Sequence, residues 1–259
     1  MIVRVGAVSP SIEGDRFKVM HRYVESRDLD LIVFPEEFFG TDFVTGRPTH
    51  VSKAEVVKKV STLAREYDVY IVTGFWHVLR NGNSYNEALL FSPEGLVGTH
   101  IKTVVTEDEM SSGCLPGDKV EVFDTRIGKI SMLICWEVWF PELARIAALK
   151  GAEIICFPTG EDISVEKDKA WVTLWWTRAI ENDVYVVQSI NAKGSVASVI
   201  CGPEKILAIS RKEGMITAEL DMDRLKKIRE GTVETRIEPA LLKRRSPFLR
   251  KIGDKIMSC

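Results

Sequence analysis

Residues 129–150, KISMLICWEVWFPELARIAALK, join a short apolar segment to an amphipathic one. Residues 130–134 form an apolar run of strand length that begins and ends with isoleucine, a β-branched residue. Pro141 then opens a stretch with apolar residues at helical spacing, and Gly151 follows it, where glycine commonly ends a helix. The pattern predicts a buried strand that passes into a helix, with Cys135 at the junction.

A side chain at this junction is held by a rigid strand. It lies at the strand's carboxyl end, where open α/β sheets place their ligands. The backbone N–H of Trp136 can point at the same place and bind a developing oxyanion. Cys135 therefore suits a catalytic nucleophile. The alternative interpretation is a buried core thiol, because free cysteine is among the most buried residue types.

The composition is that of an ordinary soluble globular protein. The chain has 259 residues, of which 45% are apolar and 28% are charged. This length fits one large α/β domain or two small ones, and we find no linker rich in Gly, Pro or Ser. We therefore predict a single domain over residues 1–259, with the basic, Pro-interrupted residues 232–259 as a C-terminal arm.

Charge and hydropathy limit the partners and the compartment. The formal net charge of -2 argues against nucleic acid or an anionic membrane as the main partner. No apolar run has the length of a membrane span, and residues 1–10 lack the layout of a signal peptide, so we expect a cytoplasmic protein. The five cysteines include no CxxC pair, which fits reduced thiols. Gln188 is the only glutamine beside abundant Glu, Lys and Arg, which hints at a thermophile.

Charged residues follow other predicted strands. Glu36 comes directly after the buried run at 29–34 and Pro35, and Lys102 ends a β-meander. The acidic cluster 107–109 follows closely. Each has a simple alternative interpretation. Glu36 could be a solvated loop carboxylate, and Lys102 a surface lysine that keeps its charge in water. The cluster 107–109 could be a solvated turn.

Together these residues have a chemical logic. A thiolate is a strong nucleophile that needs a base or a cationic neighbour near neutral pH. A carboxylate can take the thiol proton and pass it to a leaving amine, and an ammonium can hold a developing negative charge. No histidine is needed, and the four histidines fall in no Cys-His-Asn or zinc pattern. We therefore expect neither a metal nor a cofactor.

Three motifs in this order resemble those of the nitrilase superfamily, the carbon–nitrogen hydrolases. They are VFPE at 33–36, HIKTVVTEDE at 100–109 and ICWEVWFPE at 134–142. The resemblance extends over nearly the whole chain, through three flanking segments: SYNEALLFSPEGLVG at 84–98, TRAIENDVYVVQSIN at 177–191 and RRSPF at 244–248.

The resemblance implies a role for each matching residue. Cys135 would be the nucleophile, Glu36 the general base and acid, and Lys102 the stabiliser of the tetrahedral intermediate. Glu109 matches a second glutamate that helps to position the substrate, with Glu107 as the alternative. The oxyanion would be bound by Lys102 and the backbone N–H of Trp136.

Aromatic residues near these motifs are candidates for the pocket wall. Phe39, Trp139 and Trp171 could shape a compact apolar pocket, beside Trp136, but core packing is the alternative for each ring.

The implied fold is an α/β (α+β) four-layer α-β-β-α sandwich with two mixed β-sheets. The implied reaction is hydrolysis of a small amide through a cysteine thioester, in a homodimer or higher homo-oligomer. A nitrilase, an N-carbamoyl-amide hydrolase and a non-catalytic binding or assembly module on the same fold are the alternatives.

The chain departs from the family pattern at three points. Thr103-Val104-Val105 replaces a histidine-leucine type sequence after the lysine, and Trp136-Glu137 replaces the frequent Tyr-Asp pair, where Glu137 is expected to keep the structural role in the turn. The doubled Glu36-Glu37 leaves a register shifted by one residue as an alternative. These positions line or border the pocket, so the substrate stays open.

Overall fold

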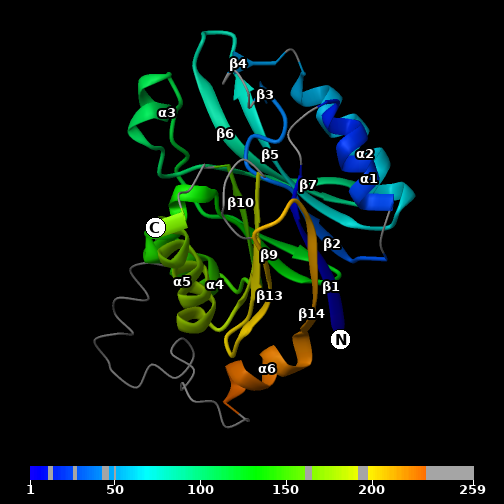
Figure 1. The fold of residues 1–259 in the computed structure, drawn as a ribbon, viewed down its shortest axis with the longest axis vertical. Helices are drawn as coiled ribbons and strands as arrows, with labels where there is room; N and C mark the ends of the chain where they lie inside the picture. Colours follow the sequence, from blue (N-terminus) through cyan, green and yellow to red (C-terminus); the bar gives the residue numbers. More distant parts are fainter. Residues whose placement is uncertain are drawn as a thin grey trace.

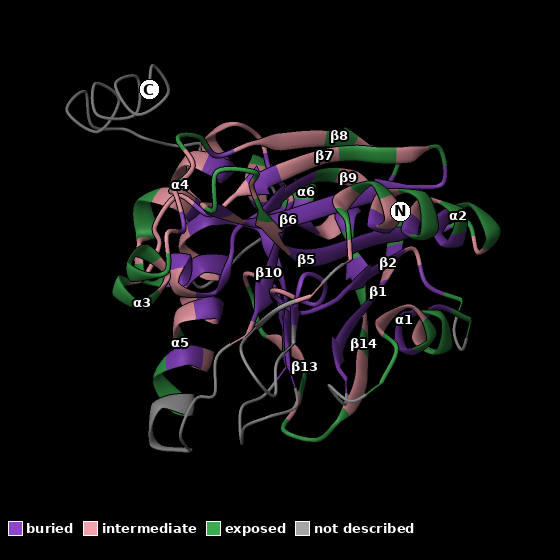
Figure 2. Ribbon diagram, turned by 90° about the horizontal axis from the view of Figure 1, so that it is seen from above, coloured by how far each residue is buried: buried purple, intermediate pink, exposed green. Residues whose placement is uncertain are grey.

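The computed structural model describes residues 1–10, 14–25, 28–42, 47–49, 51–160, 165–191 and 198–231. Two six-stranded sheets pack face to face, and helices cover their outer faces (Figures 1 and 2). α1 and α2 lie against the first sheet, and α4 and α5 lie against the second. The predicted four-layer sandwich with two mixed sheets is confirmed.

The first sheet has the order β14-β1-β2-β5-β6-β7. Its strands are β1 (Ile2–Ser9), β2 (Leu31–Val33), β5 (Tyr70–Val78), β6 (Ser84–Ser92), β7 (Gly95–Ile101) and β14 (Gly214–Asp221). The second sheet has the order β13-β12-β11-β10-β9-β8. Its strands are β8 (Val122–Thr125), β9 (Gly128–Met132), β10 (Ile154–Thr159), β11 (Tyr185–Ile190), β12 (Ser198–Cys201) and β13 (Ile206–Ser210). A two-stranded ribbon joins β3 (Thr41–Asp42) to β4 (Arg47–Pro48).

The helices are α1 (Arg16–Glu25), α2 (Lys53–Glu66), α3 (Glu107–Ser111), α4 (Pro141–Leu149), α5 (Val165–Asn182) and α6 (Met222–Glu230), with a 3-10 helix η1 at Cys135–Trp139. Among these helices, none combines the length and the apolar character needed to cross a membrane.

The alternation of side chains along a strand explains the layers. In β2, Leu31 and Val33 belong to one core with Val186 of the second sheet. Ile32, between them, points to the opposite face and packs in a separate core with Val56 of α2. A strand that is apolar at every position therefore has both faces covered, as its continuous run predicts.

Each sheet is built around three parallel strands. β1, β2 and β5 run parallel in the first sheet, and β9, β10 and β11 run parallel in the second. The remaining neighbours pair antiparallel. Because parallel strands end at the same edge of a sheet, the segments that follow them gather there, and this gathering positions the site.

Some boundaries differ from the prediction. The strand expected at 130–134 ends at Met132, and the turn of η1 comes before α4, which begins at Pro141 as expected. The acidic cluster 107–109, for which a solvated turn was the alternative interpretation, begins the short helix α3. The C-terminal arm at 232–259 lies outside the described residues, so the arm and the single domain stay predictions.

Candidate active site

The sequence candidates come from separate elements of both sheets. Glu36 follows β2, Lys102 follows β7, Cys135 begins η1 after β9, and Glu109 belongs to α3. Glu36, Lys102 and Cys135 are almost fully buried, with 5%, 2% and 4% of their surfaces exposed. Buried charges require partners, so the contacts of these groups decide whether they form one site.

Lys102 lies between two carboxylates. Its Nζ is 2.9 Å from Glu36 Oε1 and 2.7 Å from Glu109 Oε1. The structure therefore brings together three of the four sequence candidates. It also selects Glu109 over Glu107, which is exposed on α3.

Asn86 completes this arrangement. Its Nδ2 donates to the same two oxygens, 2.8 Å from Glu36 Oε1 and 2.7 Å from Glu109 Oε1. Asn86 lies beside Lys102 across the strands, because the Lys102 N–H donates to the Asn86 carbonyl at 2.9 Å. The ammonium and the amide thus hold both carboxylates by one oxygen each.

Glu109 also fixes the start of α3. Its Oε2 accepts the Thr106 N–H at 2.7 Å, and its own N–H donates to Thr106 Oγ1 at 3.2 Å, a reciprocal cap. The first turn of α3 therefore holds the Glu109 carboxylate against Lys102.

The charge of Lys102 is stable in this environment. Burial alone would lower the pKa of its ammonium, but the charges of Glu36, Cys135 and Glu109 outweigh burial and raise the pKa above its usual value. The charge of an ionised Cys135 is thus one of the interactions that favour the protonated lysine. A cation beside a cysteine favours the thiolate, the reactive form.

Cys135 has an unusual backbone conformation. Its φ is +43°, in the left-handed region that non-glycine residues rarely adopt. Such a conformation costs about 1–3 kcal/mol and is held only by its surroundings. The chain here turns sharply from β9 into η1, and this turn puts the thiol at the edge of the second sheet.

Glu37 is a third carboxyl group at the site. Its φ of +49° marks another left-handed turn, and one oxygen each of Glu36, Glu37 and Glu109 lie within 4.8 Å of one another. Burial, reinforced by the charge of Glu36, raises the pKa of Glu37 to about 8. Three acidic groups of this kind could hold a metal ion, but Lys102 already serves as the cation for two of them. The pairing of Lys102 with Glu36 supports the unshifted register of the motif.

Two glycines allow the close approach of these segments. A Cβ on Gly74 of β5 would lie 2.3 Å from the Glu37 backbone nitrogen, and one on Gly160, after β10, would lie 3.0 Å from Glu36 Oε2. Asn191, which follows β11, donates its side-chain amide to the Gly160 carbonyl. The second sheet therefore reaches the carboxylate supplied by the first.

The aromatic candidates divide into two groups. Phe39 is 1% exposed and packs against Phe17 and Phe38, with ring centroids at 4.7 and 5.0 Å. Phe39 therefore belongs to the core between the first sheet and its helices.

Trp136, Trp139 and Trp171 form a separate cluster with centroid distances of 5.6–6.3 Å. Trp171 is buried, whereas 40% of the Trp139 surface is exposed. This cluster begins at the residue after Cys135 and stays a candidate for the pocket wall.

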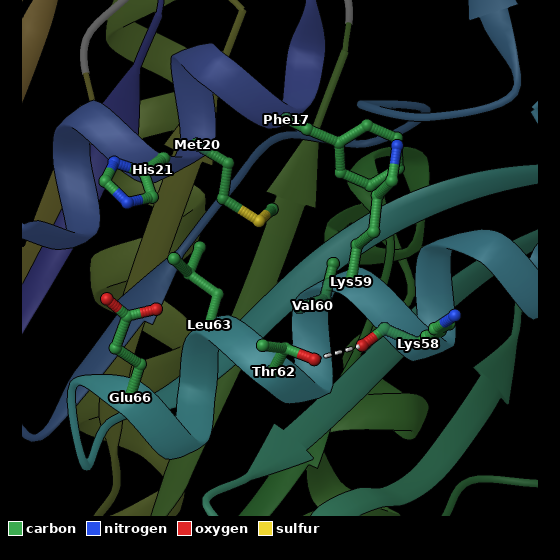
Figure 3. Close-up of a pocket in the computed structure, with 9 residues that line it drawn as sticks. All are labelled: Phe17, Met20, His21, Lys58, Lys59, Val60, Thr62, Leu63 and Glu66. Atoms are coloured by element: carbon green, nitrogen blue, oxygen red, sulfur yellow. Dashed lines mark hydrogen bonds between the residues drawn. The ribbon is translucent and has the colours of Figure 1, made fainter.

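A cavity of about 280 Å³ lies elsewhere, between α1 and α2 (Figure 3). Its lining shares no residue with the group around Lys102. Phe17 and Lys59 lie together at one end of it, with the Lys59 Nζ 4.1 Å from the ring centroid, and His21 and Glu66 lie at the other. The cavity is therefore separate from the group around Lys102.

The family is established by comparison with known proteins. The family model described as carbon-nitrogen hydrolase matches residues 13–230. The protein is a member of the carbon-nitrogen hydrolase family, within the nitrilase superfamily.

Individual relatives agree with this assignment. The chain is 28% identical to the omega-amidase NIT2 of Xenopus tropicalis over 223 residues, which cover 77% of this chain and 79% of the relative. It is 35% identical to the probable hydrolase YhcX of Bacillus subtilis over 173 residues, 62% of this chain, and the match spans only 33% of that longer protein.

Solved structures share the fold. Saccharomyces cerevisiae Nit3, a member of branch 10 of the nitrilase superfamily, is 26% identical, with a TM-score of 0.75 over 91% of this chain and 96% of that one. A carbon-nitrogen hydrolase from Helicobacter pylori G27 has a TM-score of 0.80 over 97% and 98% of the two chains at 22% identity, and shows the fold alone.

Two members of the site were not predicted from the sequence. Asn86 lies within a predicted strand, between Tyr85 and Glu87, and no pattern in the sequence marks its buried hydrogen bonds. Glu37 was considered only as a register alternative. The position of the Glu37 carboxyl group near that of Glu36 depends on a left-handed backbone conformation, which the residue type does not predict.

Proposed function

We propose that this protein hydrolyses the C–N bond of a small carboxamide through a thioester on Cys135. The buried contact of Lys102 with both Glu36 and Glu109, whose cation also interacts with the charge of an ionised Cys135, carries the proposal. It supplies a base, a cation and a nucleophile in one place. The omega-amidase relatives support an amide as the substrate.

The first half of the reaction forms the thioester. Glu36 takes the proton of the Cys135 thiol, and the thiolate attacks the amide carbon, so that the C=O electrons move to oxygen. Lys102 and the backbone N–H of Trp136 stabilise this oxyanion. As the C–N bond breaks, Glu36 returns the proton to nitrogen, and ammonia or an amine leaves.

The second half releases the acid. Glu36 takes a proton from water, and the hydroxide attacks the thioester carbon. The C–S bond then breaks, Cys135 recovers a proton from Glu36, and a carboxylic acid leaves. Glu109 and Asn86 hold Glu36 and Lys102 in place throughout, so no group has to reorganise during the reaction.

Replacement of the nucleophile tests this proposal. We expect Cys135→Ala to lower turnover by at least about a thousandfold while the fold is kept, because the covalent route is lost. Intact mass spectrometry of the wild type with substrate should show an acyl adduct on Cys135. Cys201→Ala, which changes a fully buried thiol of β12, is the matched control and should keep turnover. An active Cys135→Ala enzyme would refute the assignment.

The alternative substrates differ in the intermediate or the products that they would give. A nitrile would give a thioimidate at Cys135 in place of the tetrahedral amide adduct, and an N-carbamoyl amide would release carbamate and amine. Ammonia release from a panel of amides, nitriles and ureido acids distinguishes these alternatives. A non-catalytic module would turn over no member of the panel.

We also propose that the chain forms at least a homodimer, as the family resemblance implies. Light scattering on the purified protein tests the assembly. A monomer near 29.2 kDa at micromolar concentration would contradict it.

A further inference from the structure

Glu137 has a set of contacts that reaches both sides of the site. It is 0% exposed, and both of its oxygens accept hydrogen bonds. Oε2 lies 2.6 Å from the Ile134 nitrogen and 2.9 Å from His100 Nε2. Oε1 lies 2.7 Å from the Thr103 nitrogen and 2.5 Å from Thr103 Oγ1. A carboxylate only accepts, so His100 carries its proton on Nε2.

These partners flank the two groups that must meet. Ile134 directly precedes Cys135, and Thr103 directly follows Lys102. His100 is the last but one residue of β7, the strand that leads to Lys102. The Glu137 carboxylate therefore accepts hydrogen bonds both from the turn that carries Cys135 and from the segment that carries Lys102.

Glu137 is ionised where it lies. Burial alone would raise its pKa, but the His100 ring and the hydrogen bonds from Thr103 and Ile134 outweigh burial and lower the pKa. A fully satisfied buried carboxylate of this kind resists displacement, because moving it leaves several buried donors without a partner.

The site needs such a connection. Cys135 follows β9 of the second sheet and Lys102 follows β7 of the first, and no strand pairing joins the two sheets within the described residues. Lys102 is fixed in its own sheet through Asn86. Cys135 has a strained conformation that its surroundings must impose. The Glu137 backbone closes that turn, since its N–H donates to the Ile134 carbonyl at 3.0 Å.

We propose that Glu137 is a positioning residue that sets the distance between the Lys102 ammonium and the Cys135 sulfur. The inference rests on the proposed function and deepens it. Glu137 acts through the backbone of Ile134 and Thr103 and touches no reacting atom in the proposed reaction. Its loss therefore changes how strongly Lys102 acts on the thiol, and it changes substrate binding less.

Glu137→Gln tests the proposal with little change of shape. The amide replaces one acceptor oxygen with a donor that faces N–H or O–H groups, so up to two of the four hydrogen bonds are lost. We expect kcat to fall about 10- to 100-fold with KM changed less than about threefold, since misplacement by about 1 Å costs about this much. The pH midpoint for alkylation of Cys135 by iodoacetamide, located by mass spectrometry, should move upward because Lys102 stabilises the thiolate less.

Glu87→Gln is the matched control. Glu87 is also a buried carboxylate, 3% exposed, that contacts a histidine, His77, at 3.1 Å and Lys53 at 2.6 Å. Its loss should lower the melting temperature without moving the Cys135 alkylation midpoint. A purely structural role for Glu137 would make the two variants behave alike, and that result would overturn the proposal.

Two further variants keep the test decisive if Glu137→Gln folds poorly. Thr103→Val removes only the 2.5 Å hydroxyl contact and should move the alkylation midpoint in the same direction by a smaller amount. Glu137→Asp keeps the acceptors and should lie between Gln and the wild type. An unmoved midpoint in Thr103→Val, at full folding, counts against the inference. The alkylation assay needs no substrate, so this inference can fail while an inactive Cys135→Ala still supports the proposed function.

Discussion

The three parallel strands of the first sheet and the three of the second are arranged alike, but different chemical groups follow their carboxyl ends. β2 and β10 are each the middle strand, buried at every position, and each lies beside two parallel neighbours. The segment after β2 supplies the carboxyl groups Glu36 and Glu37, and the same sheet supplies Lys102. The second sheet supplies the Cys135 thiol and the small or neutral residues Gly160 and Asn191.

Each sheet therefore holds its part of the site at a different energetic cost. The first sheet holds a charge network that is costly to bury and must stay paired. The second sheet contributes the Cys135 thiol on a strained, left-handed backbone, a conformation that Glu37 after β2 also adopts. Changes in the first sheet should therefore alter stability and activity together, whereas changes of the thiol should alter activity almost alone. The following predictions test that contrast, from the largest expected effect to the smallest.

Lys102→Met should have the largest effect. It leaves Glu36 and Glu109 without their cation, and breaking a buried pair costs about 3–5 kcal/mol. Turnover should fall by at least about a thousandfold, and the melting temperature should fall markedly. Differential scanning calorimetry and an ammonia assay measure both effects. Cys135→Ala, by contrast, should lose turnover and keep most of its melting temperature; equal thermal losses in the two variants would contradict the contrast.

Asn86→Leu should have an intermediate effect. It removes both amide contacts, at 2.8 and 2.7 Å, but leaves Lys102 to balance the carboxylates. Loss of hydrogen bonds to charged, buried groups costs about 1–3 kcal/mol, and we expect kcat to fall about 10- to 100-fold. Urea unfolding and steady-state kinetics measure the change. A kcat as low as that of Lys102→Met would mean that the amide, and not the ammonium, organises the acids.

The sequence predicted the backbone plan and the main side chains for a simple reason. Glu36 and Cys135 each follow an apolar run and Lys102 ends a predicted β-meander, so all three stand at strand ends, which meet at a sheet edge. Asn86 lies within a strand, so its role depends on which face of β6 is turned toward Lys102. The contacts of Glu137 depend on His100, which is distant in the sequence.

The surroundings of the aromatic residues likewise depend on packing that the sequence does not predict. Phe39 and Trp139 both stand near a motif, yet the first is enclosed by Phe17 and Phe38 and the second is 40% exposed. Ring-to-ring packing is decided by helices that come from elsewhere in the chain. Spacing alone does not separate a core aromatic from a pocket aromatic.

Glu37→Gln should have the smallest effect, and one that depends on pH. In the folded protein the pKa of Glu37 is raised to about 8, whereas in the unfolded chain it is near 4.5. Between these values the folded protein holds a proton that the unfolded chain has released, so stability declines as the pH rises through this window. Glutamine does not titrate, so the variant should lose this part of the decline.

The measurement is the urea midpoint of both proteins at pH 5 and pH 8.5. The two should be similar at pH 5, and the variant should be the more stable at pH 8.5, where the wild type must ionise Glu37 beside Glu36 and Glu109. Glu107→Gln, an exposed change on the neighbouring helix α3, should leave the pH dependence unaltered. If Glu37→Gln and the wild type changed in parallel, the third carboxyl group would be solvated, and the charge network of the first sheet would consist of Glu36, Glu109 and Lys102 alone.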